Sequence, residues 1–220
     1  MVKLRAFLSY SSSDKKIVGE LTEYLEALGL VVFAAHDKLV LSQEWEQRII
    51  DELRNANVFI ALLSRRYHLS EWTDQEFGIA ISVGLLIIPL LYRTKPYGFI
   101  KRYQYHKLYG CDIRDTVVEI GKAIVSDPRL RQRFRLNLAK ALRDVSKFDF
   151  NRAIAATRLL NAIDRFTARE VNHVIYAALH NDQIWRCAAL NNVHDFFHRH
   201  RSLVSRNNVA EYRKNFPDAV

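Results

Sequence analysis

Four short apolar runs in the first half of the chain most strongly limit the folds that it can adopt. The stretches between these runs carry apolar residues at helical spacing. Strands that alternate with helices in this way predict a parallel sheet with helices on both faces. We therefore expect an α/β domain whose main strands are Leu4–Tyr10, Leu30–Ala35, Val58–Leu63 and Leu85–Leu91. The second run is apolar throughout and is expected to be a fully buried strand.

Weaker patterns complete this domain. Gly29 is expected to end the first helix, and Ser42 and Ser70 can each cap a later one. Tyr105–Cys111 predicts a weak edge strand, and Thr116–Val125 predicts a last short helix. The domain therefore carries its polar loops after the strands, where a parallel sheet binds its ligands.

Four of these loops are candidate site loops, and one of them precedes an unusual pair of side chains. The loops are Ser9–Asp14, His36–Ser42, Ser64–Ser70 and Arg93–Gly98. Trp72 and Glu76 follow the third loop and, four residues apart on a helix, share one face. Taken alone, such a pair is more typical of a core tryptophan and a solvated surface acid than of a catalytic site.

The second half of the chain shows only helical patterns after Asp127-Pro128, where Pro128 suits the first position of a helix. One helix is expected to open with the capping box Thr167-Ala-Arg-Glu170. The predicted helices cover 130–145, 150–163, 167–179 and 184–196. We expect an α/β domain over 1–126 and a small all-α helical bundle over 127–220. No repeat indicates a solenoid, and the polar tail from Ser205 is expected to be loose.

Composition places the chain among soluble globular proteins, with 49% hydrophobic and 26% charged residues. Cys111 and Cys187 stand far apart, so neither a disulfide framework nor a zinc cluster is indicated, and a cytoplasmic location is expected. No signal peptide is visible at the start. The longest apolar run, Ile79–Tyr92, is interrupted and too short to span a bilayer, so no membrane is expected.

Positive charge is concentrated in the second half. Residues 1–126 hold 16 Lys and Arg against 15 Asp and Glu, whereas residues 127–220 hold 17 against 9. This asymmetry predicts two modules with different partners. The basic half could bind nucleic acid, a nucleotide or an acidic protein, or it could be a solvated basic face.

Common catalytic motifs are absent from the sequence. It contains no glycine-rich phosphate loop, no GxSxG and no HExxH, so ATP or GTP hydrolysis of the common kinds is not expected. His194, His198 and His200 lie close together, but a metal site would need a further ligand and a supporting carboxylate. We therefore expect no metal centre.

Several motifs occur in an order that carries a family resemblance. They are the strand ending Phe7-Leu-Ser-Tyr10, the strand ending Ala61-Leu-Leu-Ser64, then Tyr67…Ser70-x-Trp72…Glu76, and then Ile88-Pro-Leu-Leu91. This order resembles the TIR (Toll/interleukin-1 receptor) domain over residues 1–125 and implies a flavodoxin-like parallel sheet flanked by helices. The chain departs from the family pattern in the second loop, where Lys38-Leu-Val-Leu-Ser42 replaces a stretch with a typical glycine.

The resemblance implies a role for Glu76. Some TIR domains are scaffolds that bind other TIR domains, and others cleave NAD with the glutamate that matches Glu76. A single carboxylate is chemically sufficient, because nicotinamide leaves a cationic pyridinium as a neutral base and needs no general acid. The carboxylate can bind the ribose hydroxyls and stabilise the positive charge of the transition state.

The resemblance also implies substrate-binding residues. Trp72 matches an aromatic that in some members stacks a nucleobase and favours cyclisation over hydrolysis. Tyr10 and Ser11 match positions that line the nicotinamide-ribose pocket. Asp37 and Lys38 lie in the loop that moves to admit substrate.

Three hypotheses follow for function. The chain resembles prokaryotic TIR effectors of anti-phage immunity, which implies cleavage of NAD to nicotinamide and either ADP-ribose or a cyclic isomer. NAD would be the substrate, with no cofactor, and self-association through the TIR domain and the C-terminal helices would activate the enzyme. The alternative is a non-enzymatic adaptor between TIR domains or an effector that mimics host TIR domains. In a third hypothesis the basic half senses a nucleic acid, a nucleotide or another activating partner, although an oligomerisation bundle is favoured there.

Overall fold

A five-stranded parallel sheet forms the first half of the chain in a computed structural model, which describes residues 3–34, 43–108, 110–144 and 149–217. The strand order is β2-β1-β3-β4-β5. The strands are β1 (Arg5–Ser9), β2 (Val31–Ala34), β3 (Val58–Leu63), β4 (Leu86–Leu91) and β5 (His106–Lys107). The four predicted main strands are confirmed, and the weak edge strand has only two residues.

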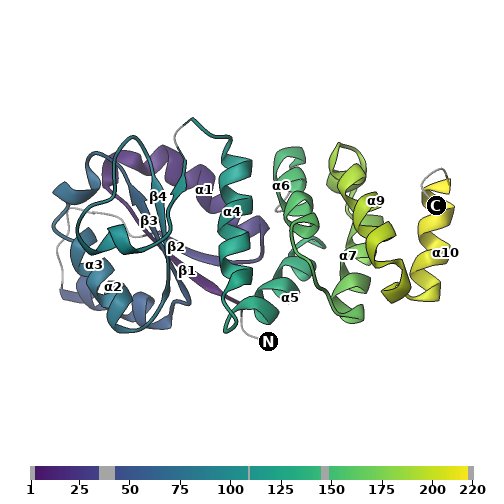
Figure 1. Cartoon of the computed structure of the whole chain (residues 1–220), viewed down its shortest axis with the longest axis horizontal. Helices are drawn as coiled ribbons and strands as arrows, with labels where there is room; N and C mark the ends of the chain where they lie inside the picture. Colours follow the sequence, from purple (N-terminus) through teal and green to yellow (C-terminus); the bar gives the residue numbers. More distant parts are fainter. Residues whose placement is uncertain (1–2, 35–42, 109, 145–148, 218–220) are drawn as a thin grey trace.

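Helices cover both faces of this sheet (Figure 1). The first face packs against α1 (Lys15–Ala27) and α4 (Ile113–Ser126), and the second against α2 (Gln43–Asn55) and α3 (Thr73–Ser82). Because side chains alternate along a strand, β1 sends Leu8 to the first core and Phe7 to the second. The predicted α/β architecture is therefore confirmed.

Two local predictions about this half are wrong. The residues of β2 are half-buried rather than fully buried, because β2 is an edge strand that pairs with β1 alone. Ser70 does not cap α3, which begins at Thr73. The Ser70 hydroxyl instead accepts the Trp72 N–H at 3.4 Å, in a turn before the helix.

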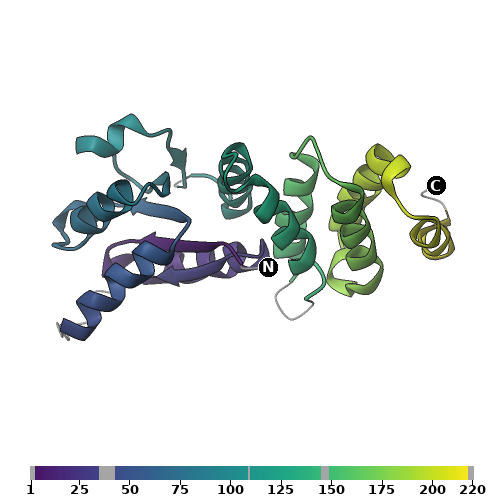
Figure 2. The same cartoon turned by 90° about the horizontal axis from the view of Figure 1, so that it is seen from below.

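The described part of the second half is helical, as predicted, and its helices stack in two rows. One row continues from α4 through α6 to α9, and the other runs from α5 through α7 to α10 (Figures 1 and 2). The helices are α5 (Arg131–Ala141), α6 (Phe150–Asn161), α7 (Ala168–His180), α8 (Asp182–Trp185), α9 (Ala189–His200) and α10 (Arg206–Asn215). The predicted capping box is confirmed, with both Thr167 and Glu170 bonded across the start of α7.

Three predictions about these helices are wrong. Asp127-Pro128 forms a turn before α5 rather than its start, with the Asp127 carboxylate accepting the Arg129 N–H at 2.8 Å. The segment 184–196 is not one helix but α8 and α9 with a break between them. The tail from Ser205 is ordered as α10, because Tyr212 is fully buried and stacks on Phe197 with ring centroids 4.1 Å apart.

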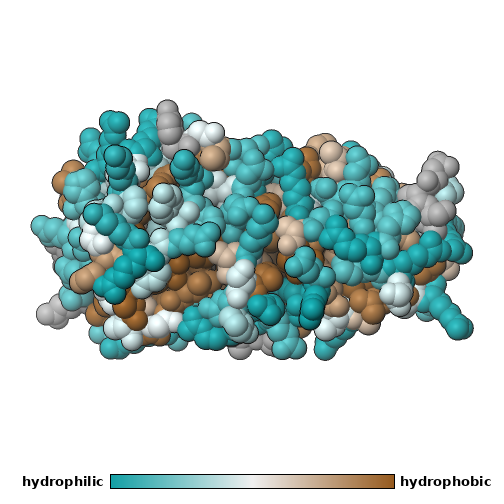
Figure 3. All heavy atoms as spheres, viewed as in Figure 1, coloured by the Kyte–Doolittle hydropathy of each residue, from teal (hydrophilic) through white to brown (hydrophobic). Residues whose placement is uncertain are grey.

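The two halves share one continuous apolar core, which extends from Leu4 in front of β1 to Tyr212 in α10. Gly29 marks a close approach: its φ is +87°, and an added Cβ would lie 2.6 Å from the Asn137 carbonyl oxygen of α5. On the face seen in Figure 3, hydrophobic residues gather in a band that runs from the sheet toward the first C-terminal helices. The domain boundary at residue 127 stays a prediction.

The sheet points away from the helical half. β1 begins near the middle of the molecule and runs away from the C-terminal helices (Figures 1 and 2). All strand pairs are parallel, so the carboxyl ends share the distal edge. The edge at which α/β sheets bind ligands is therefore not covered by the described C-terminal helices.

Candidate active site

Glu76 lies in the first half of α3 and is a buried acid. The residue is only 3% exposed, so the interpretation of Glu76 as a solvated surface acid is wrong. The start of the helix is fixed by Thr73, whose hydroxyl donates to the Tyr67 carbonyl oxygen at 2.7 Å. A carboxylate removed from water needs hydrogen-bond donors, since burial without them costs several kcal/mol.

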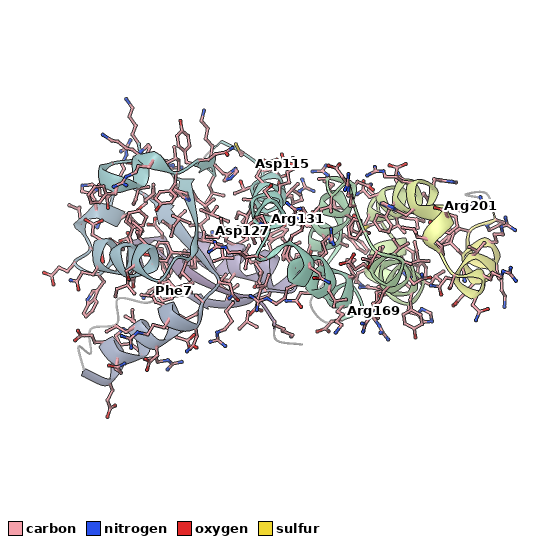
Figure 4. All side chains as sticks on the ribbon, turned by 60° about the horizontal axis from the view of Figure 1, so that its bottom comes forward. Phe7, Asp115, Asp127, Arg131, Arg169 and Arg201 are labelled. Carbon is pink, nitrogen blue, oxygen red and sulfur yellow. The ribbon has the colours of Figure 1, made fainter. Side chains whose placement is uncertain are left out.

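Ser9 supplies one such donor from the end of β1. Its Oγ donates to Glu76 Oε2 at 2.5 Å, and Ser9 itself is fully buried. The side-chain alternation that sends Phe7 to the second core also places Ser9 on the α3 side of the sheet. Figure 4 labels Phe7 on this strand. The bond thus ties the helix that carries Glu76 to the carboxyl end of a central strand.

Tyr67 extends this bond into a chain of three groups. Its hydroxyl lies 3.0 Å from Ser9 Oγ, and the residue is fully buried. Burial first, and the negative charge of Glu76 second, raise the pKa of Tyr67 well above its ordinary value, so the phenol stays protonated. Because the Ser9 proton is directed at Glu76, the Tyr67 hydroxyl donates to Ser9. The direction of the chain is therefore Tyr67 to Ser9 to Glu76.

Of the other five predicted site residues, the structure describes Trp72, Ser11 and Tyr10. Trp72 is the half-buried N-cap residue of α3, and its carbonyl oxygen accepts the Glu76 N–H at 2.8 Å. Ser11 is buried and its Oγ lies 3.0 Å from Ser13 Oγ. Tyr10 is 2% exposed and belongs to the first core, which α1 and α4 cover. Asp37 and Lys38 lie outside the described residues.

Sequence reasoning missed Ser9 and Tyr67 as partners of Glu76. Both stand in the motifs that carry the family resemblance, Phe7-Leu-Ser-Tyr10 and Tyr67…Ser70. Side chains two residues apart on a strand lie on the same face of the sheet, so the sequence could have placed Ser9 on the same face as Phe7. The contact with Tyr67 required the course of the loop after β3, which has no simple periodicity.

The described residues contain no group of three or more His, Cys, Asp or Glu side chains that could hold a metal ion. In the histidine-rich stretch, His194 Nδ1 bonds to the Tyr212 hydroxyl at 2.6 Å. His200 lies against the rings of Phe166 and Phe196. These histidines therefore take part in the packing of the last helices. Within the described ranges, no helix is both long and apolar enough to cross a membrane.

The strand order, with helices on both faces, defines a flavodoxin-like α/β domain. The family model of the TIR domain matches residues 6–120, and the chain therefore belongs to the TIR-domain family. Among solved structures, the chain is similar to one described as Clostridium botulinum CMP N-glycosidase, BcmB. That likeness has 22% identity and a TM-score of 0.40, and covers 53% of this chain and 97% of the other. No curated protein matches the chain.

Proposed function

We propose that this TIR-domain protein cleaves the bond between nicotinamide and ribose in NAD. The observation that carries the proposal is the buried Glu76 carboxylate, held by the Ser9 hydroxyl at 2.5 Å beside the carboxyl edge of the sheet. An acid held in this way has a fixed orientation, which electrostatic catalysis requires. The implied role in anti-phage immunity depends on the family resemblance alone.

The reaction needs little beyond this carboxylate. As the C1′–N bond breaks, its electron pair returns to the pyridinium nitrogen, and nicotinamide leaves as a neutral base. Positive charge develops at C1′, and the negative charge of Glu76 stabilises it. Attack by water then gives ADP-ribose and releases one proton, whereas attack by the adenine ring gives a cyclic isomer. The resemblance assigns this choice to Trp72.

Access to Glu76 sets a requirement on the mechanism. With 3% exposure, the carboxylate meets substrate only if binding or self-association displaces a neighbouring side chain. Activation by self-association fits this requirement, because an assembled second copy can complete a site that a single copy leaves closed.

The test is to incubate purified protein with NAD and to follow nicotinamide by chromatography and the second product by mass spectrometry. Glu76→Gln is expected to lower the turnover by at least about a hundredfold, because it removes the charge that stabilises the transition state. Glu71→Gln is the matched control, since Glu71 is an exposed acid five residues earlier. Equal turnover in wild type and Glu76→Gln, at protein concentrations that allow assembly, would exclude the proposal.

One observation favours the adaptor alternative as a second function. Leu69 and Phe99 are 71% and 66% exposed, and the ring contact of His68 with Tyr97 at 5.8 Å joins their two segments. Exposed apolar side chains of this size are typical of interaction surfaces. Leu69→Asp should abolish self-association in analytical ultracentrifugation. If NAD turnover is absent in wild type and association remains, the adaptor function is the better account.

A further inference from the structure

A cavity of about 610 Å³ lies at the carboxyl edge of the sheet, in a place that the Glu76 site does not explain. Its lining comes from the loops after β1, β3 and β4: Ser13, Asp14, Ser64, Arg65, Arg66, Tyr92 and Arg93. The strand order changes direction between β1 and β3, and open α/β sheets bind ligands at such a switch point. Neither Glu76 nor Trp72 lines this cavity.

The charge of the lining favours an anion. Arg65, Arg66 and Arg93 stand against the single acid Asp14. No described carboxylate lies within ion-pair distance of Arg65 or Arg66, and Arg65 Nε donates to the Arg93 carbonyl oxygen at 3.4 Å. A guanidinium offers several planar donors that match the oxygens of a phosphate.

Backbone geometry and Asp14 add two independent observations. Arg93 has a φ of +60°, in the left-handed region that a residue with a side chain seldom adopts, and such strain clusters at ligand sites. Asp14 Oδ2 is buried and accepts no hydrogen bond from any described residue. An orphan carboxylate oxygen inside a basic cavity fits a ligand that has hydroxyl groups as well as phosphates.

The cavity also has room for more than a single phosphate. A second hollow of about 280 Å³ shares Ser13, Asp14 and Tyr92 with it and extends along α1 to Lys16, Ile17 and Glu20, so that the combined lining holds four basic side chains and two acids. The two hollows therefore form one trough beside the start of α1. The positive end of this helix dipole adds to the attraction for an anion.

We propose that this trough binds a ribose diphosphate group, with Arg65, Arg66 and Arg93 on the phosphates and Asp14 on a ribose hydroxyl. This group has two possible sources: the substrate NAD itself, or a separate nucleotide such as ADP. The bond between Ser11 and Ser13 at 3.0 Å joins the trough to the loop after β1 that was predicted to line the nicotinamide-ribose pocket. The binding does not depend on the chemistry of Glu76.

The first experiment measures the binding of ADP and of inorganic pyrophosphate by isothermal titration calorimetry. The double variant Arg65→Gln/Arg66→Gln is expected to weaken both ligands at least about tenfold, because two charged donors are lost. Both arginines are exposed, so the variant should fold. Arg102→Gln is the control: it removes an exposed arginine that stacks on Phe99 at 4.4 Å and does not line the trough.

Asp14→Ala distinguishes binding of the ribose from binding of the diphosphate. The variant should bind ADP about fivefold more weakly, since the hydroxyl loses its acceptor, and pyrophosphate no more weakly than wild type, since a repelling charge is removed. Asp14 makes no capping bond to α1, so the change does not disturb the helix start. The proposal is overturned if ADP does not bind at millimolar concentration, or binds the arginine variant as tightly as wild type.

The second experiment identifies the source. If NAD supplies the group, the arginine variant lowers kcat/KM for NAD but not for nicotinamide riboside, which has no phosphate. If a separate nucleotide supplies the ribose diphosphate group, ADP binds without raising KM for NAD. In that case the arginine variant has the same kcat/KM as wild type for NAD and for nicotinamide riboside. Either result supports the trough as a ribose diphosphate site. The calorimetry decides the proposal even if the protein does not cleave NAD.

Discussion

Ser9→Ala is the sharpest test of how the buried acid is held. The substitution removes the donor 2.5 Å from Glu76 Oε2, and it also removes the acceptor 3.0 Å from the Tyr67 hydroxyl. Both remaining groups are buried, so water does not readily replace the lost partner. The effect should therefore exceed that of deleting an ordinary surface serine.

The expected magnitude follows from these two bonds. A hydrogen bond to a charged group contributes about 1.5 to 3 kcal/mol, and a buried group left without a partner costs about 1 to 3 kcal/mol. Allowing for partial relaxation, we expect Ser9→Ala to lower the free energy of unfolding by about 3 kcal/mol. For a chain of this length that corresponds to a fall in Tm of about 9 °C.

A double-mutant cycle with Glu76→Gln isolates the charged bond. Without the negative charge, Ser9→Ala should cost only about 1.5 kcal/mol, leaving a coupling energy of about 1.5 kcal/mol. Urea unfolding followed by circular dichroism gives all four free energies. If Ser9→Ala costs the same whether residue 76 is Glu or Gln, the bond does not stabilise the carboxylate and the reasoning fails.

Three further predictions concern other parts of the molecule. Gly29→Ala should lower the free energy of unfolding by about 2 kcal/mol more than Gly84→Ala. Both glycines have a positive φ, but only at Gly29 would the added Cβ collide with the Asn137 carbonyl oxygen. Equal losses of stability in the two variants would contradict this contact. Burial raises the pKa of Tyr67, so the folded state should lose stability as the pH rises above the ordinary value of 10.0, and urea unfolding should show a shallower alkaline loss for Tyr67→Phe. Burial lowers the pKa of His200 in the folded state, so below pH 6.5, the ordinary pKa of histidine, proton binding favours the unfolded state and the fold loses stability. The free energy of unfolding of His200→Leu, measured relative to wild type, should therefore rise as the pH falls. A difference that does not change with pH would refute this.

The sheet could be predicted from the sequence because the pattern that marks each strand is local. Each main strand is an apolar run with polar neighbours, and the parallel order follows from the helices between runs. The error at β2 has a different origin: an apolar run does not reveal whether its strand is central or at the edge, since that depends on pairing with strands distant in sequence. The stacking of α4, α6 and α9 likewise depends on contacts between helices that no sequence repeat marks.

The candidate site was predictable only in part for a related reason. Glu76 was found through the order of the family motifs, whereas its donor Ser9 comes from a strand 67 residues earlier. A serine at the end of a strand is also a common start of a turn, so residue type alone does not single it out. The loops Ser9–Asp14, Ser64–Ser70 and Arg93–Gly98, which supply most of the trough lining, were predicted as candidate site loops, but its three arginines were not singled out because they stand in two separate loops.

The position of α1 gives the two halves of the molecule a direct physical link. Its first turn follows Asp14 and helps to line the trough, while the chain just after its last residue, at Gly29, lies against Asn137 of α5. Figure 4 labels Arg131, Arg169 and Arg201, which lie at separate points along the helical half. The carboxyl edge of the sheet faces away from those helices. Within one copy of the chain, an effect of a partner bound to those helices on the site can pass through packed elements, and α1, at about 20 Å in length, is one that touches both ends.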